Sequence, residues 1–583
     1  MSGDTSRGRL WREWCDPVVM AAVVLGVALR VAGLSHALPL VYNPDEVSIV
    51  SRALALGSGD LNPHNFLYPS LFFYLLAAAV GALAGLQWMT GQVSSLSVFE
   101  TQFWRDPTAV YLVARSLSVL SGVLTIVATW RLALTVGTRT SARVAAVLMA
   151  VAYVPVRDAH FVKHDVPATL LIVFAMLAGW RVWQQGRTRD YALAGVVTGV
   201  ASALHYYAVF AVVSLLCAHG LRAGSSWRRW VGFRLWLTAG ASLAAFAACS
   251  PYVIIDWPTA LQDIQANRAI IVDRARQAYG LFGSAMPQLR ILAAQGTGVA
   301  WLAAALVGFV AMARTSRATA LWLLSFPAVF IVFISNTWPY GRTANPLYPF
   351  LAVFAAGGIV CLSQWFRRSA AAGVIILTVV AAATPLVRSI TLVHLLRQTD
   401  TRTLASAWVE ANIPAGSSVA VEPYSVQLVP TKAQLTAALA HAGIQPARAG
   451  RRARGLLARD PYPAPAYALF YIGDGGLDED KLYVTPAALA KDQAVPPASG
   501  PCVEYVILKS AAPSGPNALS ASVARLVVLV HRDTPFRDSD PGLTADGFLP
   551  DFDVPPSLAV LRPGPVIEIW RTSSPCGNRG RRP

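Results

Sequence analysis

Charged residues are scarce in this sequence of 583 residues. Only 14% of the chain is Asp, Glu, Lys or Arg, whereas 55% is hydrophobic. A soluble domain carries roughly 25% charged residues, so this scarcity excludes a wholly soluble protein. Several apolar runs reach the roughly 20 residues that a helix needs to cross a bilayer. We therefore predict an α-helical polytopic membrane protein, with clear runs at 18–34, 235–253, 291–313 and 370–387.

Lysine is also scarce, and the net charge of +17 comes almost entirely from arginine. A nucleic-acid-binding protein would gather such charge on one soluble face. Here the arginines form short clusters between apolar runs, which argues against a nucleic-acid partner and is typical of cytoplasmic loops beside membrane lipids. About 11–12 spans, each of roughly 20 residues, satisfy this alternation. It leaves four main loops outside the cytoplasm: residues 35–69, 158–165, 254–290 and 336–345.

One apolar run does not fit the alternation of charged loops. Residues 69–89 are long enough to span the membrane, yet counting them as a crossing would invert every later loop. Either this stretch is a re-entrant or interfacial helix, which the alternation of the loops favours, or one of the other spans is miscounted.

Cysteine is rare too, with six in the chain and no CxxC or other metal-binding spacing. Four of the six lie in or beside apolar runs, where cysteine behaves as a small hydrophobic residue. The other two, Cys502 and Cys576, lie in the polar C-terminal part. If that part is extracytoplasmic they could form a disulfide or remain free.

The composition changes after Arg397, where proline, glycine and charges of both signs become frequent. Residues 401–412 have the apolar spacing of a helix and end before the breaker Pro414. Short runs of strand length follow, and residues 436–460 carry no clear pattern. We therefore predict a transmembrane catalytic domain at 1–397 and a soluble extracytoplasmic α/β domain at 398–583. The expected strands are 419–421, 505–508, 526–530 and 566–570.

Two of the expected outer loops concentrate acidic and histidine residues. Charged groups next to apolar spans are costly, and they are functional candidates for that reason. Carboxylates and imidazoles gathered on one side of a membrane are the groups needed for general-base catalysis or for binding a divalent metal ion. The first loop holds Asp45, Glu46, Arg52 and His64, and the second holds Lys163, His164 and Asp165.

Each of these residues also has a structural explanation. Asp45 follows Pro44, which suits the first turn of a helix, so Asp45 could simply stabilise that turn. Asp165 could likewise begin the next span, and a single histidine such as His64 is more often a polar loop residue than a ligand. Arg342 could bind phosphate or anchor the chain at the outer interface. Spacing alone leaves these alternatives open.

The order of several motifs along the chain resembles the GT-C membrane glycosyltransferases. The resemblance is to the branch that contains the protein O-mannosyltransferases and the bacterial aminoarabinose transferases, the glycosyltransferase family 39-like proteins. It extends over nearly the whole chain. The motifs are Asn43-Pro44-Asp45-Glu46, Tyr68-Pro69-Ser70, Arg115-Ser116-Leu117-Ser118, Lys163-His164-Asp165-Val166-Pro167, Ser250-Pro251-Tyr252, Arg342 before Pro346-Leu347-Tyr348-Pro349, and Asp400 through Pro414.

This resemblance implies inverting transfer of a sugar from a polyprenyl-phosphate carrier to an extracytoplasmic acceptor, which would be a lipid, a polysaccharide or a protein. Asp45 would be the catalytic base, with Glu46 supporting it and Asp165 at a second acidic position. The setting it implies is the plasma membrane of a bacterial cell. A phosphate leaving group needs positive charge nearby rather than a strong acid. The candidates for that contact are Lys163, Arg52, Arg342 and His164.

The sequence departs from the family at one point. The aminoarabinose transferases carry Glu-Lys before the proline that aligns with Pro69, and this chain has Leu67 and Tyr68 there. A metal or phosphate contact by that pair does not carry over. A divalent metal ion remains possible, with His64, His164 and Asp165 as candidate ligands.

Two functions from other classes compete with sugar transfer. A transporter or flippase of lipid-linked glycans would show broken helices and polar residues at the membrane midplane, often in two similar halves. This chain keeps its polar residues at the level of the loops, and no matching halves stand out. An inactive membrane scaffold is the other alternative, and the carboxylates Asp45, Glu46 and Asp165 argue against it.

Overall fold

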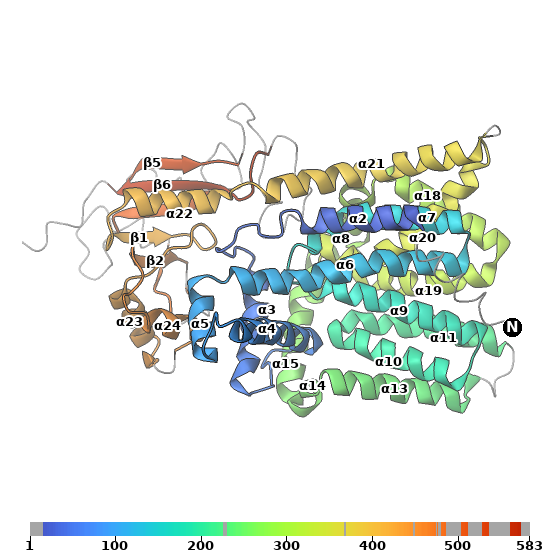
Figure 1. Cartoon of the computed structure of the whole chain (residues 1–583), viewed down its shortest axis with the longest axis horizontal. Coiled ribbons are helices and arrows are strands. Elements are labelled where there is room, and N and C mark those ends of the chain that lie inside the picture. Colours follow the sequence, from blue (N-terminus) through green and yellow to red (C-terminus); the bar gives the residue numbers. More distant parts are fainter. Residues whose placement is uncertain are drawn as a thin grey trace, which may run out of the picture. The chain divides into compact units, whose positions relative to one another are not determined.

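The computed structural model describes residues 16–224, 230–366, 369–446, 449–473, 475, 480–485, 503–510, 527–535 and 560–572 (Figure 1). The chain divides into two compact units. Unit 1 comprises 1–34, 44–87 and 110–393, and unit 2 comprises 35–43, 88–109 and 394–583. Two segments from the first 110 residues therefore belong to the unit that contains the C-terminal part of the chain.

Unit 1 is built from helices, most of which run side by side in Figure 1, with α3, α4 and α15 gathered at one end of them. The helices are α2 (Pro17–Val31), α3 (Pro44–Ala55), η1 (Leu56–Ser58), α4 (Leu71–Met89), α6 (Thr108–Val136), α7 (Arg139–Val151), α8 (Tyr153–Asp158), α9 (Asp165–Gln184), α10 (Thr188–Leu204), η2 (Tyr206–Phe210), α11 (Ala211–Ala223), α13 (Phe233–Cys249), α14 (Tyr252–Ile255), α15 (Trp257–Arg268), η3 (Ala269–Asp273), α16 (Arg274–Tyr279), α17 (Ala285–Arg290), η4 (Ile291–Thr297), α18 (Val299–Thr315), α19 (Arg317–Ile334), η5 (Gly341–Leu347), α20 (Tyr348–Ser363) and α21 (Ala370–Leu396).

The helices confirm the prediction of a multi-spanning membrane protein. Within the described residues, seven helical segments are long and apolar enough to cross a membrane, and the bent pair that includes α18 would make eight. Two shorter apolar helices, α2 and α13, coincide with apolar runs found in the sequence. By this length criterion the count is lower than the 11–12 spans expected. The helix α4 is one of the seven, so its interfacial placement stays a prediction.

Small residues allow helices of unit 1 to approach each other closely. A Cβ atom on Gly195 or Gly199 of α10 would lie within 2.4 Å or 2.2 Å of a backbone oxygen of α13. Gly308 of α18 and Gly358 of α20 face each other in the same way, with distances of 1.8 Å and 1.9 Å. Glycines at such crossings are typical of membrane helices, which associate through close backbone packing rather than through the hydrophobic effect.

Among its described residues, unit 2 contains a six-stranded sheet in the order β3-β2-β1-β4-β6-β5. The strands β1 to β4 are parallel to one another, whereas β6 runs antiparallel to both β4 and β5. Its elements are α5 (Leu96–Arg105), α22 (Thr401–Asn412), β1 (Ser418–Val421), α23 (Lys432–His441), α24 (Arg451–Leu457), β2 (Ala468–Ile472), β3 (Tyr483–Val484), β4 (Tyr505–Ser510), β5 (Val527–Asp533) and β6 (Val566–Thr572).

Side chains on alternate positions of the strands enter two different cores. Val419 and Val421 of β1 pack with α22, while Ala420 packs on the opposite face with Val506 and Leu508 of β4. The predicted helix at 401–412 is α22, and its first turn is capped by the side chain of Asp400. The four predicted strands correspond to β1, β4, β5 and β6. Cys502 and Cys576 lie outside the described residues.

The sequence did not predict every element of unit 2. Strands β2 and β3 had not been expected, and the unassigned stretch 436–460 contains most of α23 and all of α24. These two helices pack through a small core of their own, which includes Leu435, Leu439 and Ala453.

The close crossing of α10 and α13 makes a testable prediction. Gly199→Ala should lower the thermal midpoint of the detergent-solubilised protein, because the new methyl group would lie 2.2 Å from the carbonyl oxygen of Ser242. Gly240→Ala on α13 is the matched control, since nothing lies within 4 Å of its added Cβ atom, and alanine is favoured over glycine in a helix. Equal midpoints for the two variants would contradict this packing.

Candidate active site

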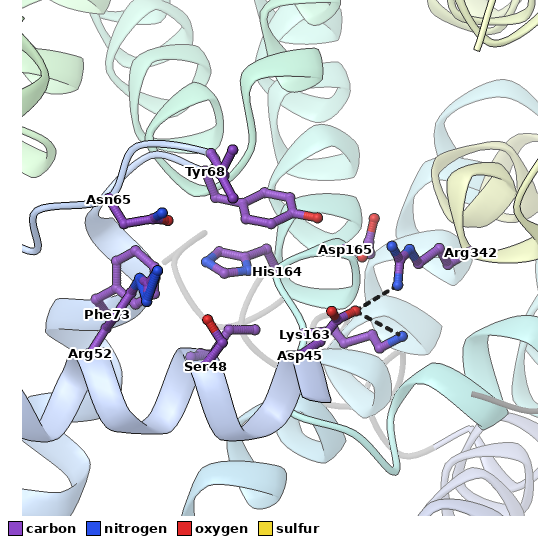
Figure 2. Close-up of a pocket in the computed structure, with 12 residues that line it drawn as sticks. Asp45, Ser48, Arg52, Asn65, Tyr68, Phe73, Lys163, His164, Asp165 and Arg342 are labelled. Carbon is purple, nitrogen blue, oxygen red and sulfur yellow. Dashed lines mark hydrogen bonds and ion pairs between the residues drawn. The ribbon is translucent and has the colours of Figure 1, made fainter. Parts of the chain in front are cut away.

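A pocket of about 90 Å³ in unit 1 collects residues from both predicted outer loops (Figure 2). Its walls come from α3, the chain between η1 and α4, the start of α4, the residues just before and at the start of α9, and η5. Of the predicted site residues, the pocket brings together Asp45, Arg52, Lys163, His164, Asp165 and Arg342, whereas Glu46 and His64 do not line it. The other lining residues are Ser48, Ile49, Asn65, Leu67, Tyr68 and Phe73.

Asp45 lies in the first turn of α3 and points toward two cations. Its Oδ2 atom is 2.7 Å from Nη1 of Arg342 and 3.9 Å from Nζ of Lys163 (Figure 2). The carboxylate is 42% exposed, whereas the side chain of Lys163 is only 3% exposed. A negative charge in the first turn of a helix also interacts favourably with the helix dipole. Stabilising the helix and lining the pocket are therefore compatible for this residue.

Glu46 is fully buried and makes a different set of contacts from its neighbour. Its carboxylate accepts two hydrogen bonds from Arg115 of α6, from Nε at 2.9 Å and from Nη2 at 2.8 Å. It also accepts the backbone N–H of Val162 at 2.9 Å. The chain just before Lys163 is thereby held against α3. In this position Glu46 supports the pocket by fixing its walls and does not reach into it.

Asp165 is the first residue of α9, and its buried side chain lines the pocket. It accepts a hydrogen bond of 3.1 Å from the hydroxyl of Tyr207, and Nε2 of His205 lies 4.0 Å from the same oxygen atom. The His205 ring stacks on the Tyr207 ring with centroids 3.6 Å apart. Asp165 is thus held by η2 and the residue that precedes it, which sequence reasoning had not linked to the site.

The 3₁₀ helix η5, which carries Arg342, is anchored to α8. Asn345 donates a hydrogen bond to Asp158, whose other carboxylate oxygen accepts Nε of Arg157 at 2.7 Å. All three side chains are buried. Residues three apart on a 3₁₀ helix project to the same side, so Asn345 fixes the helix from which Arg342 reaches Asp45.

The stretch of chain that carries Asn65, Leu67 and Tyr68 forms several hydrogen bonds with the segment 250–267. The N–H of Phe66 donates to Asp263 at 2.7 Å, and Asn267 donates to the carbonyl of Leu67 at 2.9 Å. The N–H of Ser70 donates to the hydroxyl of Ser250 at 3.0 Å. This part of the first outer loop is therefore a fixed wall of the pocket.

Arg52 lies about two helical turns after Asp45 on α3 and also lines the pocket. Burial lowers the pKa of its guanidinium, an effect that the carboxylate of Asp263 opposes. The pocket thus holds three basic side chains, those of Arg52, Lys163 and Arg342, together with two carboxylates. Such an arrangement can accept an anionic group.

The three candidate metal ligands are not brought together. His64 is exposed and pairs with Asp60 at 2.7 Å, and this contact lowers the pKa of that carboxyl. His164 and Asp165 line the pocket without it. Among the described residues, no group of three or more His, Cys, Asp or Glu side chains is arranged to hold a metal ion. His64, His164 and Asp165 therefore do not form a metal site in the described part of the chain.

Comparison with known structures identifies the fold. The chain resembles ArnT from Cupriavidus metallidurans in the apo state, with 12% identity and a TM-score of 0.50 over 95% of this chain and 97% of that chain. It is therefore a multi-pass membrane protein with the GT-C fold, which confirms the assignment made from the sequence. A family model described as dolichyl-phosphate-mannose-protein mannosyltransferase matches residues 108–255, about a quarter of the chain.

Two other solved structures match the chain with lower TM-scores. The mycobacterial arabinofuranosyltransferase AftD is 16% identical, with a TM-score of 0.43 over 97% of this chain and 40% of that one. An Archaeoglobus fulgidus oligosaccharyltransferase is 13% identical, with a TM-score of 0.42 over 70% of this chain, and this chain spans 61% of its length. No curated protein is significantly similar to the chain.

The buried ion pair predicts a loss of stability when one partner is changed. Glu46→Gln would leave the Arg115 guanidinium buried without a countercharge, and breaking a buried pair in this way typically costs about 3–5 kcal/mol. We expect a clear fall in the thermal midpoint in detergent. The double variant Glu46→Gln/Arg115→Met, which removes both charges, should recover part of that fall. An unchanged midpoint for Glu46→Gln alone would contradict the assigned role.

The buried histidines predict a dependence of stability on pH. Burial lowers the pKa of His164 to about 3 and that of His160 to about 4, from 6.5. The unfolded chain therefore takes up protons below about pH 6.5 that the folded chain does not. The stability that depends on neutral rings is fully present above this pH and is lost progressively as the pH falls toward these lower values.

This effect can be measured as the thermal midpoint between pH 8 and pH 4.5. His164→Phe should make the fall in midpoint toward low pH smaller, because one buried ring no longer has a proton to exclude. His441→Phe, at an exposed position of α23, is the control and should leave the slope unchanged. Equal slopes for wild type and His164→Phe would show that His164 is not held neutral by burial.

Proposed function

We propose that this chain is a glycosyltransferase that moves a hexosyl or pentosyl group from a polyprenyl-phosphate donor to a hydroxyl acceptor outside the cytoplasm. The observation that carries the proposal is the position of Asp45. Its carboxylate is partly exposed in a pocket and lies within ion-pair distance of Arg342 and Lys163. A base and two phosphate-binding cations are thus available at one place, which is what a displacement on a sugar phosphate requires.

In the proposed step the acceptor oxygen attacks the anomeric carbon of the donor. The bond between that carbon and the phosphate oxygen breaks, and polyprenyl phosphate leaves. The proton of the acceptor hydroxyl passes to Asp45, which raises the nucleophilicity of an otherwise weak nucleophile. A single displacement of this kind inverts the configuration at the anomeric carbon. The phosphate needs no proton from an acid, because the cations offset the charge that develops on it.

The donor phosphate would compete with Asp45 for its cations. The carboxylate lies next to Arg342 and Lys163, at a position where an anion is favoured. A phosphate that took over these contacts would release Asp45 toward the acceptor. Arg52, on the same pocket, would add a third positive charge for the phosphate. His164 fits this role poorly, because burial keeps its pKa near 3 and its ring uncharged at neutral pH.

The other two carboxylates have supporting roles in this proposal. Asp165 is held by Tyr207 and orients the acceptor or the sugar from its place beside Arg342 (Figure 2). Glu46 acts as a positioning residue through Arg115 and Val162.

The relatives support the proposed carrier, and the distribution of charge supports the proposed setting. ArnT from Cupriavidus metallidurans has also been solved bound to undecaprenyl phosphate, and the matching family model is named for a dolichyl-phosphate donor. We infer a donor of the same polyprenyl-phosphate class here. The distribution of arginines supports a location of the pocket and unit 2 outside the cytoplasm, and we infer the plasma membrane of a bacterial cell envelope as the setting. The acceptor would be a lipid, a polysaccharide or a protein.

The decisive variant is Asp45→Asn, which preserves size and hydrogen bonding but cannot take up the proton. We expect loss of transfer by at least about a hundredfold, the lower range of a general-base contribution, with membrane insertion and thermal midpoint retained. The readout is the glycolipid and glycan profile of a deletion strain complemented with each variant. Asp60→Asn, which removes an exposed carboxylate in the same loop, is the control and should restore the missing sugar fully.

Three results would speak against this proposal. Full complementation by Asp45→Asn would exclude Asp45 as the base. A deletion strain that accumulates unmodified lipid-linked intermediates at the inner leaflet would indicate lipid movement instead of sugar transfer. Retention of configuration at the transferred sugar, determined by NMR on the product, would contradict a single displacement.

A further inference from the structure

One side of the pocket is formed by uncharged rings, and the proposed transfer step does not use them. His164 and Tyr68 make up this surface, which we call the ring wall (Figure 2). The charged side chains Asp45, Lys163, Asp165 and Arg342 lie together elsewhere in the same pocket (Figure 2). The aromatic surface and this cluster of four charged side chains therefore line different parts of the pocket, and Arg52 lies apart from the cluster, beside Phe73 (Figure 2).

The imidazole of His164 is fixed by rings around it. It stacks on Tyr68 with centroids 4.5 Å apart and an interplanar angle of 13°. Phe72 and Phe73 of α4 approach it with centroid distances of 4.7 Å and 5.4 Å. The residue is only 2% exposed. These contacts fix the orientation of the ring, so its nitrogen atoms are held in constant positions.

The Nε2 atom of His164 is buried and has no hydrogen-bond partner among the residues that the structure describes. A buried polar atom without a partner costs free energy, and it is usually explained by a bound group that completes it. The low pKa of the ring, about 3 because of burial, means that the partner meets a neutral imidazole. One ring nitrogen then donates a hydrogen bond and the other accepts one, which suits a hydroxyl group.

Tyr68 is as firmly placed as His164. The chain on both sides of it is held through the carbonyl of Leu67 and the N–H of Ser70. The edge of its ring meets His205 at a centroid distance of 5.1 Å. A rigid aromatic ring offers an apolar face at little cost in conformational entropy. The C–H face of a sugar ring is the part of a glycosyl donor that suits such a surface.

The charges in the pocket disfavour a cationic sugar. Both carboxylates that line the described pocket already have partners in the chain, Asp45 in Arg342 and Lys163, and Asp165 in Tyr207. The lining also contains three basic side chains. An ammonium group on the sugar would meet like charges, and neither carboxylate would be available to it, because Asp165 is engaged by Tyr207 and Asp45 is assigned to the acceptor proton in the proposed step.

We propose that the ring wall is the sugar subsite, that His164 Nε2 forms a hydrogen bond with a sugar hydroxyl, and that the subsite selects an uncharged monosaccharide over an amino sugar. This inference rests on the function proposed above and specifies its donor. His164 is then a specificity-determining residue for the glycosyl group, while the cations at the other side bind the phosphate.

The test is a set of binding measurements on the purified full-length protein in detergent, with short-chain lipid probes. The probes are farnesyl phosphate and farnesyl phosphate carrying mannose, glucose, arabinose or 4-amino-4-deoxyarabinose. At least one neutral sugar should improve binding about tenfold or more over farnesyl phosphate alone. The arabinose and 4-amino-4-deoxyarabinose probes are a matched pair, and the aminated one should bind at least about tenfold more weakly than its neutral partner.

Variants assign this gain to the ring wall. His164→Phe retains an aromatic ring and loses the hydrogen bond. It should therefore weaken binding of the neutral-sugar probe by about two- to tenfold, which removes most of the gain over farnesyl phosphate. Tyr68→Leu should reduce the same gain by removing the stacking surface. Both variants should bind sugar-free farnesyl phosphate as the wild type does, which a merely structural defect would not allow. The exposed-site variant His441→Phe should change nothing.

Different results overturn different claims. If no sugar improves binding, if the aminated probe binds as well as its neutral partner, or if His164→Phe weakens farnesyl phosphate and its sugar derivatives equally, the sugar subsite is not the ring wall. The phosphate site of the proposed function would stand in all three cases. If the wild type binds none of the lipids, both the subsite and the proposed donor class fail.

Discussion

The pocket depends on the contrast between two neighbouring carboxylates, Asp45 and Glu46. Successive residues on an α-helix project about 100° apart, so one can face the pocket while the other faces the core. Glu46 uses its buried position to bind Arg115 of α6 and the backbone of Val162, and it thereby joins three separate segments. Lys163 follows Val162 directly. The ion pair in the core thus determines where a cation of the pocket lies.

The remaining walls are fixed by similar buried contacts. Asp158 holds η5 through Asn345, which sets the position of Arg342. The segment 250–267 holds the chain around Leu67 through hydrogen bonds to its backbone. Buried polar groups of this kind are costly unless each one is paired. These paired groups surround the pocket, and they hold its walls in a defined position despite the cost of burying them.

Much of the architecture could be predicted because it depends on local patterns. Apolar runs predict spans, arginine clusters predict loops, and short runs of strand length predict β1, β4, β5 and β6. The GT-C fold followed from the order of motifs along the chain. The grouping of Asp45, Lys163, Asp165 and Arg342 in one pocket is consistent with the topology derived from charge.

The contacts between distant segments could not be predicted. The sequence shows Arg115 inside an apolar run, a signal that a buried partner exists, but it does not show that the partner is Glu46. Arg30, near the end of the first apolar run, is buried and donates to the carbonyl oxygens of Met149 and Ala150, two partners that the sequence does not indicate. The stacking of His164 on Tyr68 joins residues nearly one hundred positions apart. No periodicity encodes such pairs, because they depend on tertiary packing.

The central claim is that the cations paired with Asp45, namely Arg342 and Lys163, bind the donor phosphate. A structure of the wild-type protein with a bound polyprenyl-phosphoryl sugar tests it most directly. The account predicts the phosphate within hydrogen-bond distance of Arg342 and Lys163, with the Asp45 carboxylate turned away from them toward the anomeric carbon. A phosphate bound elsewhere, with the contact between Asp45 and Arg342 still at 2.7 Å, would contradict it.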